Sequence, residues 1–470
     1  MRILLVNPET ESAKKGYSSA IFPPLGILYM ASILREAKHD VKVIDYFVLS
    51  VKEDYNYDSL KKDILEFKPD IIGTSCFSSN IKYAENILDI SKEVSPKTIT
   101  IIGGPHITAV PNYLINIKSA DYGIYGEAEY SLLEFADKLA SKESINEIYG
   151  IIYRDGDIIN FKKREFIKDL DALPLPARDL VPMELYQPSA AAYKQLPATT
   201  LITSRGCPYQ CVFCHKPIFG NQFRPHSAEY VTNEMEVLHR EFGVNDFRIY
   251  DDTFTLNRDR VIEICNILIK KNMDINWNCA TRVDHVDYEL LKIMKQAGCY
   301  NVSFGVESGT ERVLKLIKKG VNKDQIKNAF KWTRKLEIES VAFFIIGLPT
   351  QTKEEVLETI KFAKELNPSF VQFTLVSPHP DTELYELCKK HGKTNIGDWS
   401  NLNTYSNIDT DLPFVPYTIP EKELKKLYRK AYISFYFRPR YLYSKLLNLF
   451  KSDKPISKLK RGISTIFSRV

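Results

Sequence analysis

Three cysteines crowd into eight residues of the sequence, at Cys207, Cys211 and Cys214. Three thiolates on one compact loop can each hold one iron of a four-iron cubane cluster, which leaves one iron for an external ligand. A structural zinc site needs four protein ligands. The only neighbouring candidate is His215, and no second cysteine pair follows downstream. The spacing therefore indicates an iron–sulfur cluster, with a zinc knuckle as the alternative.

Polar and glycine-containing motifs recur downstream, each directly after a short apolar run. These runs have the length and composition of buried strands. Alone, each motif has an ordinary structural interpretation, because Asp-Asp commonly caps a helix and Gly-Leu-Pro commonly forms a turn. Together they predict a set of side chains gathered at one edge of a sheet. The candidate residues are Asp251, Asp252, Thr253, Arg282, Glu307 and Gly347.

A different set of residues follows the strand-like runs of the first 145 residues. They are small, or expose backbone, and so suit the close approach of a large planar ligand. A nucleotide-binding domain is the alternative, but the sequence has no G-x-G-x-x-G. The candidate residues are Pro24, Leu25, Gly26, Thr74, Ser75, Gly103, Gly104, Pro105, Gly126 and Glu127.

Alternating strand and helix patterns must position both sets. In the first 145 residues they predict a doubly wound parallel sheet, an α/β fold that binds ligands beyond the carboxyl ends of its strands. A hairpin with its turn at Asp155-Gly156 and a proline-containing linker follow, over residues 146–195. The expected strands of this part are 2–6, 41–44, 70–74, 98–102 and 121–125, with hairpin strands at 150–153 and 158–161.

A second α/β series over residues 196–415 predicts a partial (β/α)6 barrel of the TIM type, whose chemistry lies at the carboxyl ends of its strands. Residues 288–296 and 354–366 have clear helical spacing. We expect residues 416–470 to form a helical, basic C-terminal region. The expected strands are 200–203, 246–250, 275–279, 300–304, 340–346 and 370–376.

Composition narrows the class of protein. The 470 residues are 44% hydrophobic and 26% charged, enough to bury several cores, and no apolar run reaches the length of a membrane span. The formal charge is +5, yet residues 436–470 alone carry nine Lys/Arg and one Asp. The remaining chain is slightly acidic, so we expect no nucleic-acid partner. The absence of a basic-then-apolar leader and of a disulfide pattern predicts a cytoplasmic protein.

The cysteine motif resembles that of the radical S-adenosylmethionine (radical SAM) superfamily, C-x3-C-x2-C with an aromatic residue before the last cysteine. Here that aromatic residue is Phe213. The resemblance implies a 4Fe-4S cluster on the three cysteines, with S-adenosylmethionine completing the fourth iron and being cleaved to a 5′-deoxyadenosyl radical. It implies that Phe213 and six further residues contact S-adenosylmethionine. Asp251, Asp252 and Thr253 correspond to the contacts with its amino group, Arg282 to a polar contact, Glu307 to the ribose and Gly347 to the adenine.

The first domain resembles the cobalamin-binding domain of one large branch of this superfamily. The resemblance implies that its glycine-rich edge binds cobalamin. The Asp-x-His-x-x-Gly motif of cobalamin domains with a histidine ligand is absent from the chain. His106, in Gly-Gly-Pro-His, is a weaker candidate for a cobalt ligand, and we expect the lower cobalt face to lack a protein imidazole.

This combination implies a cobalamin-dependent radical SAM C-methyltransferase acting on an unactivated carbon. One alternative is a radical cyclase of the tetrapyrrole type, which shares both domains. Another is a non-catalytic cobalamin sensor or carrier, against which the intact cysteine triad argues. We expect a small-molecule or lipid substrate and an external electron donor of the ferredoxin or flavodoxin type.

The C-terminal tail interleaves aromatic and leucine side chains with basic ones, as in Arg438, Arg440 and Lys445. Such a helix can lie in the headgroup layer of a membrane, where each basic residue contributes roughly 1 kcal/mol. The tail therefore predicts peripheral binding at the inner face of the membrane. The alternative is a terminal helix packed on the barrel with a frayed, solvated end.

Overall fold

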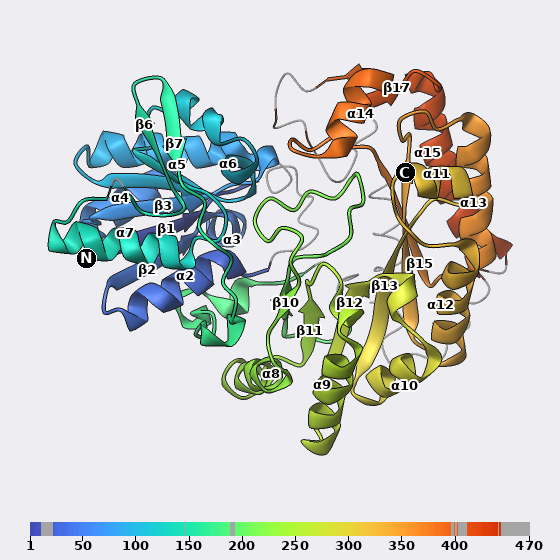
Figure 1. Ribbon diagram of the computed structural model, residues 1–470. Helices are drawn as coiled ribbons and strands as arrows, with labels where there is room; N and C mark the ends of the chain where they lie inside the picture. Colours follow the sequence, from blue (N-terminus) through green and yellow to red (C-terminus); the bar gives the residue numbers. More distant parts are fainter. Residues whose placement is uncertain are drawn as a thin grey trace. The chain divides into compact units, whose positions relative to one another are not determined.

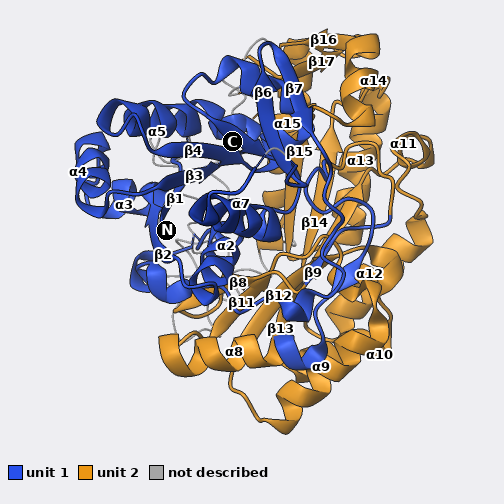
Figure 2. Ribbon diagram, turned by 60° about the vertical axis from the view of Figure 1, so that its left-hand side comes forward, with its two compact units in different colours: residues 1–189, 204–208, 215–230 blue, residues 190–203, 209–214, 231–470 orange. Residues whose placement is uncertain are grey.

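The computed structural model describes residues 1–10, 22–145, 147–188, 193–395, 399, 402, 411–439 and 441–442. The expected membrane-binding tail therefore lies almost wholly outside the described residues. Contacts divide the chain into two compact units (Figure 2). Unit 1 comprises residues 1–189, 204–208 and 215–230, and unit 2 comprises residues 190–203, 209–214 and 231–470.

Unit 1 contains a seven-stranded sheet of order β2-β1-β3-β4-β5-β6-β7 (Figure 1). The first five strands are parallel, as predicted, and their order reverses between β1 and β3. At such a reversal the loops beyond the strands diverge and leave room for a ligand. The hairpin extends this sheet in the antiparallel sense. The strands are β1 (Arg2–Asn7), β2 (Asp40–Asp45), β3 (Ile71–Ser75), β4 (Ile99–Gly103), β5 (Tyr122–Ile124), β6 (Ile151–Asp155) and β7 (Ile158–Phe161).

Alternating side chains of β1 serve two separate cores. Ile3 and Leu5 pack in the cluster with α2 (Leu25–Glu36) and α7 (Glu129–Ser141). Leu4 and Val6 face the other way, into the cluster that includes residues of α4 (Tyr57–Phe67) and α5 (Ile81–Val94). Because side chains alternate along a strand, this pattern shows helices on both faces of the sheet. The doubly wound prediction is therefore confirmed. Two shorter helices are α3 (Tyr46–Lys52) and α6 (Pro105–Ala109).

Unit 2 contains a six-stranded sheet of order β15-β14-β13-β12-β11-β8, in which every pair is parallel. The spatial order follows the order along the chain, as in an opened (β/α) barrel. This confirms the predicted series of six β/α units. The strands are β8 (Ala198–Leu201), β11 (Asp246–Ile249), β12 (Asn276–Thr281), β13 (Cys299–Glu307), β14 (Glu339–Ile346) and β15 (Phe370–Leu375).

Helices separate successive strands of unit 2 and cover its sheet (Figure 1). The predicted helix 288–296 matches α10 (Tyr288–Gln296), which begins at the Asp287 side chain accepting from the Leu290 N–H. The others are α8 (Ala228–Phe242), α9 (Arg258–Lys270), α11 (Glu311–Leu316), α12 (Lys323–Lys335), α13 (Lys353–Leu366), α14 (Glu383–His391) and α15 (Glu421–Tyr436).

Two short antiparallel pairs complete the described fold. In unit 1, β9 (Ser204–Arg205) pairs with β10 (Arg224–Pro225), and Arg205 lies directly opposite Arg224. In unit 2, β16 (Gly392–Thr394) pairs with β17 (Phe414–Pro416). The β9–β10 pair matters for the site, because β9 is the start of the cysteine segment.

Candidate functional site

The cysteine segment, residues 204–214, contains residues of both compact units. Cys207 belongs to unit 1, where its N–H donates to the Gly220 carbonyl at 3.3 Å and its carbonyl accepts from Lys216 Nζ at 2.9 Å. Cys211 and Cys214 belong to unit 2, where the Cys214 N–H donates to the Cys211 carbonyl at 3.1 Å. All eight cysteines of the chain are thiols. The segment therefore carries three thiols, the donor type that iron–sulfur clusters use.

Residues that follow β12 hold the part of the cysteine segment that belongs to unit 2. The guanidinium of Arg282 lies over the ring of Tyr209, 3.6 Å from its centroid, and its Nη1 approaches Cys211 Sγ at 3.9 Å. The Tyr209 hydroxyl also bonds the His285 ring. Tyr209 lies between two of the cysteines, so these contacts fix the loop from its middle.

Asp284 holds Arg282 in this orientation. Its two carboxylate oxygens accept from Arg282 Nε and Nη2, each at 2.9 Å, and Nη2 also donates to the Lys319 carbonyl at 2.8 Å. Burial lowers the pKa of Arg282, but Asp284 and the neighbouring Cys211 raise it, and the net shift is upward. A fixed positive charge therefore lies beside a candidate cluster ligand.

Glu307, the predicted ribose contact, ends β13 in the left-handed region of the backbone, with φ of 66°. Its Oε1 accepts from Lys319 Nζ at 2.8 Å, and both side chains are buried. The pair lies over Gly305, where a Cβ would come within 2.4 Å of Glu307 Oε1 and 2.7 Å of Lys319 Nζ. Gly305 is therefore needed to leave room for the ion pair. Lys319 Nζ is also 5.7 Å from the centroid of the Phe213 ring.

The remaining candidates of unit 2 differ in exposure. Asp251 is buried, and its carboxylate accepts from the N–H and the hydroxyl of Thr203, both at 2.6 Å. Asp252 is exposed, whereas Thr253 is buried with its hydroxyl donating to the Asp252 carbonyl. Gly347 adopts φ of 82°, and its N–H donates to Gln351 Oε1 at 2.9 Å. Asp251 therefore orders the start of the cysteine segment, and Asp252 is the exposed carboxylate of the two.

The carboxyl edge of the first sheet presents backbone more than side chains. Gly26 is exposed at the start of α2, and a Cβ added there or at Gly126 would meet nothing within 4 Å. Gly104 is the opposite case: its φ is 97°, and a Cβ would lie 2.6 Å from Ser75 Oγ and 2.7 Å from the Cys76 backbone. The edge thus combines open backbone with one turn that only glycine permits.

Other candidates on this edge support the turns. The Thr74 hydroxyl donates to the Val6 carbonyl at 3.0 Å, which ties β3 to β1. Leu25 and Gly103 are buried, whereas Pro24, Ser75 and Pro105 are partly exposed. Glu127 is buried, with its carboxylate turned toward arginines of unit 1. Some candidates of this edge are therefore exposed, and the others hold its loops in place.

His106 lies inside unit 1. Its side chain is fully buried, its Nδ1 is 2.9 Å from Ser78 Oγ, and its ring packs edge-on against Tyr113. Burial lowers the pKa of His106 from 6.5 to about 4. The ring would have to leave this environment to reach a ligand at the sheet edge, which favours the expectation that it is not a cobalt ligand.

Comparisons with known proteins follow the two units. A family model for the radical SAM superfamily matches residues 201–363, and one for the B12 binding domain matches residues 16–136. An uncharacterized methyltransferase of Pyrococcus horikoshii is 37% identical over 445 residues, covering 94% of each chain. The chain belongs to the B12-binding branch of the radical SAM superfamily.

Two further comparisons agree with this family. The cytidylyl-2-hydroxyethylphosphonate methyltransferase of Streptomyces wedmorensis is 30% identical, over 83% of this chain and 82% of the relative. The radical SAM methyltransferase TsrM of Kitasatospora setae, solved with cobalamin and a [4Fe-4S] cluster, has a TM-score of 0.73 at 16% identity, covering 93% of this chain and 89% of its own. That likeness shows a shared fold.

The residues present fit the cofactors of a radical SAM enzyme of this branch: S-adenosylmethionine, a 4Fe-4S cluster and cobalamin. Within the described ranges no three His, Cys, Asp or Glu side chains converge closely enough to hold a metal ion. The fit of the cluster therefore rests on the type and spacing of the three thiols and on the cation beside Cys211. The fit of the corrin rests on the open backbone at Gly26 and Gly126.

Four residues of this radical SAM enzyme escaped the sequence analysis: Tyr209, Asp284, His285 and Lys319. Tyr209 could have been suspected, because it stands between two motif cysteines. Lys319 carries no such signal, since it belongs to a Lys-Lys-Gly run that resembles any solvated turn. Only the fold, which returns the chain to the cysteine segment after α11, brings Lys319 to Glu307.

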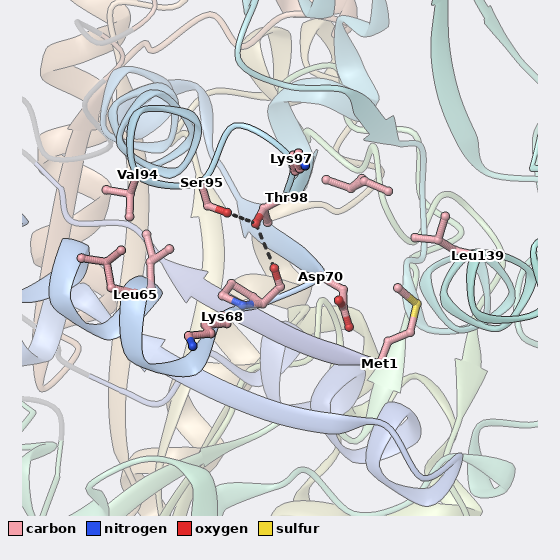
Figure 3. A pocket seen from close by; sticks show the side chains of 12 residues that line it. Met1, Leu65, Lys68, Asp70, Val94, Ser95, Lys97, Thr98 and Leu139 are labelled. Atoms are coloured by element: carbon pink, nitrogen blue, oxygen red, sulfur yellow. Dashed lines mark hydrogen bonds between the residues drawn. The ribbon is translucent and has the colours of Figure 1, made fainter.

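One hollow of unit 1 lies outside this site (Figure 3). It has a volume of about 440 Å³ and lies at the amino ends of β1, β3 and β4, where Met1, Asp70 and Thr98 line it. Parallel sheets bind ligands at the opposite edge.

Among the described helices, none is both long enough and apolar enough to cross a lipid bilayer.

Proposed function

We propose that this radical SAM enzyme is a C-methyltransferase that acts on an unactivated carbon of a small-molecule or lipid substrate. The observation that carries the proposal is the presence, in one chain, of the complete cysteine motif and an open, glycine-containing cobalamin edge. Both of the closely similar relatives described above are named methyltransferases. When bound, S-adenosylmethionine and the cluster supply a hydrogen-abstracting radical, and cobalamin carries the methyl group.

The protein's own residues bind and orient these groups. We assign Cys207, Cys211 and Cys214 to three irons of the cluster. Arg282 donates toward Cys211 Sγ and holds Tyr209, so the loop keeps one orientation. Precise placement of reacting groups is the main contribution that such a scaffold makes.

We assign the polar residues of unit 2 to S-adenosylmethionine. Asp252, Thr253 and Arg282 would contact its polar groups, Glu307 its ribose and Gly347 its adenine. Lys319 Nζ donates a hydrogen bond to Glu307 Oε1 at 2.8 Å. The other oxygen, Oε2, is therefore the acceptor that we assign to a ribose hydroxyl. Asp251 acts through Thr203 and positions the chain before the motif.

We assign the corrin to the carboxyl edge of the first sheet, with Pro24, Leu25, Gly26, Thr74, Ser75, Gly103, Gly104, Pro105, Gly126 and Glu127 forming or supporting its surface. By this assignment residues 1–145 are the cobalamin-binding domain, 146–195 the hairpin and linker, 196–415 the radical SAM barrel and 416–470 the C-terminal region. A ferredoxin- or flavodoxin-type donor would reduce the cluster. We further propose a cytoplasmic location, with peripheral membrane contact through the tail.

The test uses anaerobically reconstituted full-length protein with cobalamin, a strong reductant and S-adenosylmethionine labelled in its methyl group. We expect 5′-deoxyadenosine to form and label to appear in the corrin fraction. Cys211→Ala should lose both activities and still bind cobalamin, whereas Cys265→Ala, which changes a buried thiol of α9, should retain both. If 5′-deoxyadenosine forms and the corrin stays unlabelled, a cyclase-type reaction replaces methyl transfer. If neither product forms, the proposed function is wrong.

A further inference from the structure

A buried cluster of four charged side chains lies in unit 1, and one of its members, Glu127, is among the corrin residues assigned above. It consists of Glu127 and Glu129, at the turn between β5 and α7, and of Arg205 and Arg224, on the paired strands β9 and β10. Arg205 Nη1 donates to Glu127 Oε1 at 2.8 Å and Nη2 to Glu129 Oε1 at 2.7 Å. Arg224 Nη1 donates to both oxygens of Glu127, at 2.9 and 2.8 Å.

The cluster is balanced and almost completely removed from water. The exposed fractions of the side chains are 2% for Arg205, 3% for Arg224, 4% for Glu127 and 7% for Glu129. Two arginines placed directly opposite each other on paired strands would repel. Glu127 bonds both of them, so the carboxylates are what permits this arrangement. A buried ion pair adds little net stability compared with apolar packing. Stabilisation alone therefore does not explain these four charges, and a role in positioning neighbouring residues does.

The residues that follow Arg205 leave no freedom between it and the first cysteine. Gly206 adopts φ of 80°, and a Cβ there would lie 2.2 Å from the Gln222 carbonyl oxygen. The next residue is Cys207, whose N–H is bound to the Gly220 carbonyl. A displacement of Arg205 is therefore transmitted directly to Cys207.

The other end of the cluster lies beside the candidate corrin surface. Gly126 precedes Glu127, adopts φ of 76° and has open space where a side chain would begin. In this turn the backbone of Gly126 faces open space, whereas the carboxylates of Glu127 and Glu129 point into unit 1. Glu127 is also saturated, because its Oε2 accepts from the Ile167 N–H at 2.9 Å in addition to Arg224.

We propose that Glu127 and Glu129 are positioning residues for the iron–sulfur cluster: through Arg205 they fix Cys207, and they link the corrin-facing turn to the first cluster ligand. This rests on the proposed function for the identity of the two cofactors, but not on methyl transfer. It changes the role of Glu127 from a direct cobalamin contact to a support of the cluster segment. Residues that hydrogen-bond to metal ligands or hold them in place commonly change metal affinity by roughly 10–100-fold when altered.

The experiment compares full-length wild type with Glu129→Gln and Arg205→Lys. Glu129→Gln keeps the shape of the side chain and removes one of the two carboxylates that hold Arg205. Arg205→Lys keeps the positive charge and loses the fork that reaches both carboxylates. The matched control is Glu134→Gln, which alters a carboxylate on the same helix, α7, that pairs with Arg164 and Lys138 and does not contact residues 204–208.

Each protein is reconstituted anaerobically and measured without substrate. We expect both variants to lose iron to a chelator roughly 10-fold faster than wild type and to show an altered EPR spectrum of the reduced cluster. Bound cobalamin should stay at the wild-type stoichiometry, and the control should match wild type in every measurement.

Three outcomes would overturn the proposal. Unchanged iron release and EPR spectra in both variants would show that the charges do not position the cluster. A parallel loss of cobalamin and iron, or failure of both variants to fold, would show that the charges only stabilise unit 1. Because neither readout needs product formation, a wild-type protein that fails to label its corrin would contradict the proposed function and leave this test intact.

Discussion

The two parallel sheets of this chain both place their candidate residues at the carboxyl edge, yet the two edges present different chemical groups. The first edge offers open backbone at Gly26 and Gly126 and keeps its charged side chains inside. The second edge turns buried charge toward the loop ends, in Arg282, Glu307 and Lys319.

The difference matches the ligands that we assign to the two edges. A corrin is a large, flat ring system, and a surface without protruding side chains lets it approach closely. S-adenosylmethionine is small and charged, and buried partner charges can recognise it strongly because they are shielded from water. The first edge should therefore be sensitive to added volume and the second to lost charge.

The largest effect is expected from breaking the Glu307–Lys319 pair. Glu307→Gln leaves a buried ammonium without its partner, so we expect the free energy of unfolding to fall by about 3 kcal/mol or more. Affinity of the reconstituted protein for S-adenosylmethionine should fall roughly 10-fold, since a hydrogen bond to a charged group is lost. Urea denaturation and equilibrium dialysis measure the two quantities.

The double variant Glu307→Gln with Lys319→Met separates the two roles of this pair. Removing both charges should restore most of the stability while binding stays weak. Glu383→Gln is the matched control, because Glu383 pairs with Lys318 at a half-exposed position, where a loss should stay within about 1 kcal/mol. If the double variant regains full affinity, the second edge does not act through charge.

The next effect concerns the pH dependence of unit 1. His106 is buried with its pKa lowered from 6.5 to about 4, whereas the unfolded chain takes up a proton near pH 6.5. Between these values the unfolded state binds more protons, so stability falls as the pH drops from 6.5 toward 4. The loss reaches about 3 kcal/mol at the acid end. Urea denaturation at several pH values should show this slope.

His106→Gln should reduce that slope but not remove it, because burial also lowers the pKa of His285 and of His379. His391→Gln, in α14 of unit 2, should leave the slope as it is in wild type. His106 also tests the contrast between the edges. If the cobalt(II) form of the bound cofactor shows nitrogen splitting in its EPR spectrum that His106→Gln abolishes, the first edge does use a side-chain ligand, and the contrast is wrong.

Added volume at the first edge should separate stability from binding. Gly26→Ala places a methyl group in open space on a helix, so stability should stay equal or rise by up to about 1 kcal/mol. Cobalamin affinity should fall roughly 10-fold if the ring lies against this backbone, because a single methylene changes contact energies by about 1 kcal/mol or more. Fluorescence quenching on cobalamin titration measures the affinity.

Gly156→Ala is the opposite case, and it serves as the control. Gly156 also has open space but adopts φ of 60° in the hairpin turn, so stability should fall by about 1 kcal/mol while cobalamin affinity stays unchanged. Equal affinity for wild type and Gly26→Ala would remove Gly26 from the corrin surface.

The sequence predicted the architecture better than the supporting contacts, for reasons that particular residues make clear. Periodicity predicted α10 to the residue, because apolar positions and an Asp cap mark its ends. The first barrel strand was expected at 200–203 and is β8 (Ala198–Leu201). The run 199–203, rich in β-branched residues, continues past the last strand pair, Leu201 with Ile249, and composition alone does not show where pairing stops.

The direction in which side chains point was the second feature that the sequence did not predict. The motif Tyr125-Gly126-Glu127 was correctly placed at a strand end, but pattern cannot tell that Gly126 faces outward while the Glu127 carboxylate turns inward to two arginines. Lys319 and Glu307 meet only because β13 and the turn after α11 are brought together by the fold. Motifs local in sequence were therefore predictable, and partners supplied by tertiary structure were not.

A further effect concerns the outer strands rather than the ligand edges. The hairpin β6–β7 follows β5 in the first sheet by backbone pairing, whereas side chains of α15 cover β15, the last strand of the second. The hydroxyl of Tyr432 accepts from the Phe373 N–H at 3.1 Å and donates to its carbonyl at 2.9 Å, and Tyr436 makes the same pair of bonds to Val371 at 3.1 and 2.8 Å. Tyr432→Phe or Tyr436→Phe should each lower the free energy of unfolding by about 1–3 kcal/mol, because backbone groups of a buried strand lose their partner. Tyr417→Phe, at a side chain that is 68% exposed, should change nothing. Neither tyrosine reaches the ligand edge, so cofactor content should match wild type in all three variants; a loss of bound cofactor would show that β15 supports the site as well as the fold.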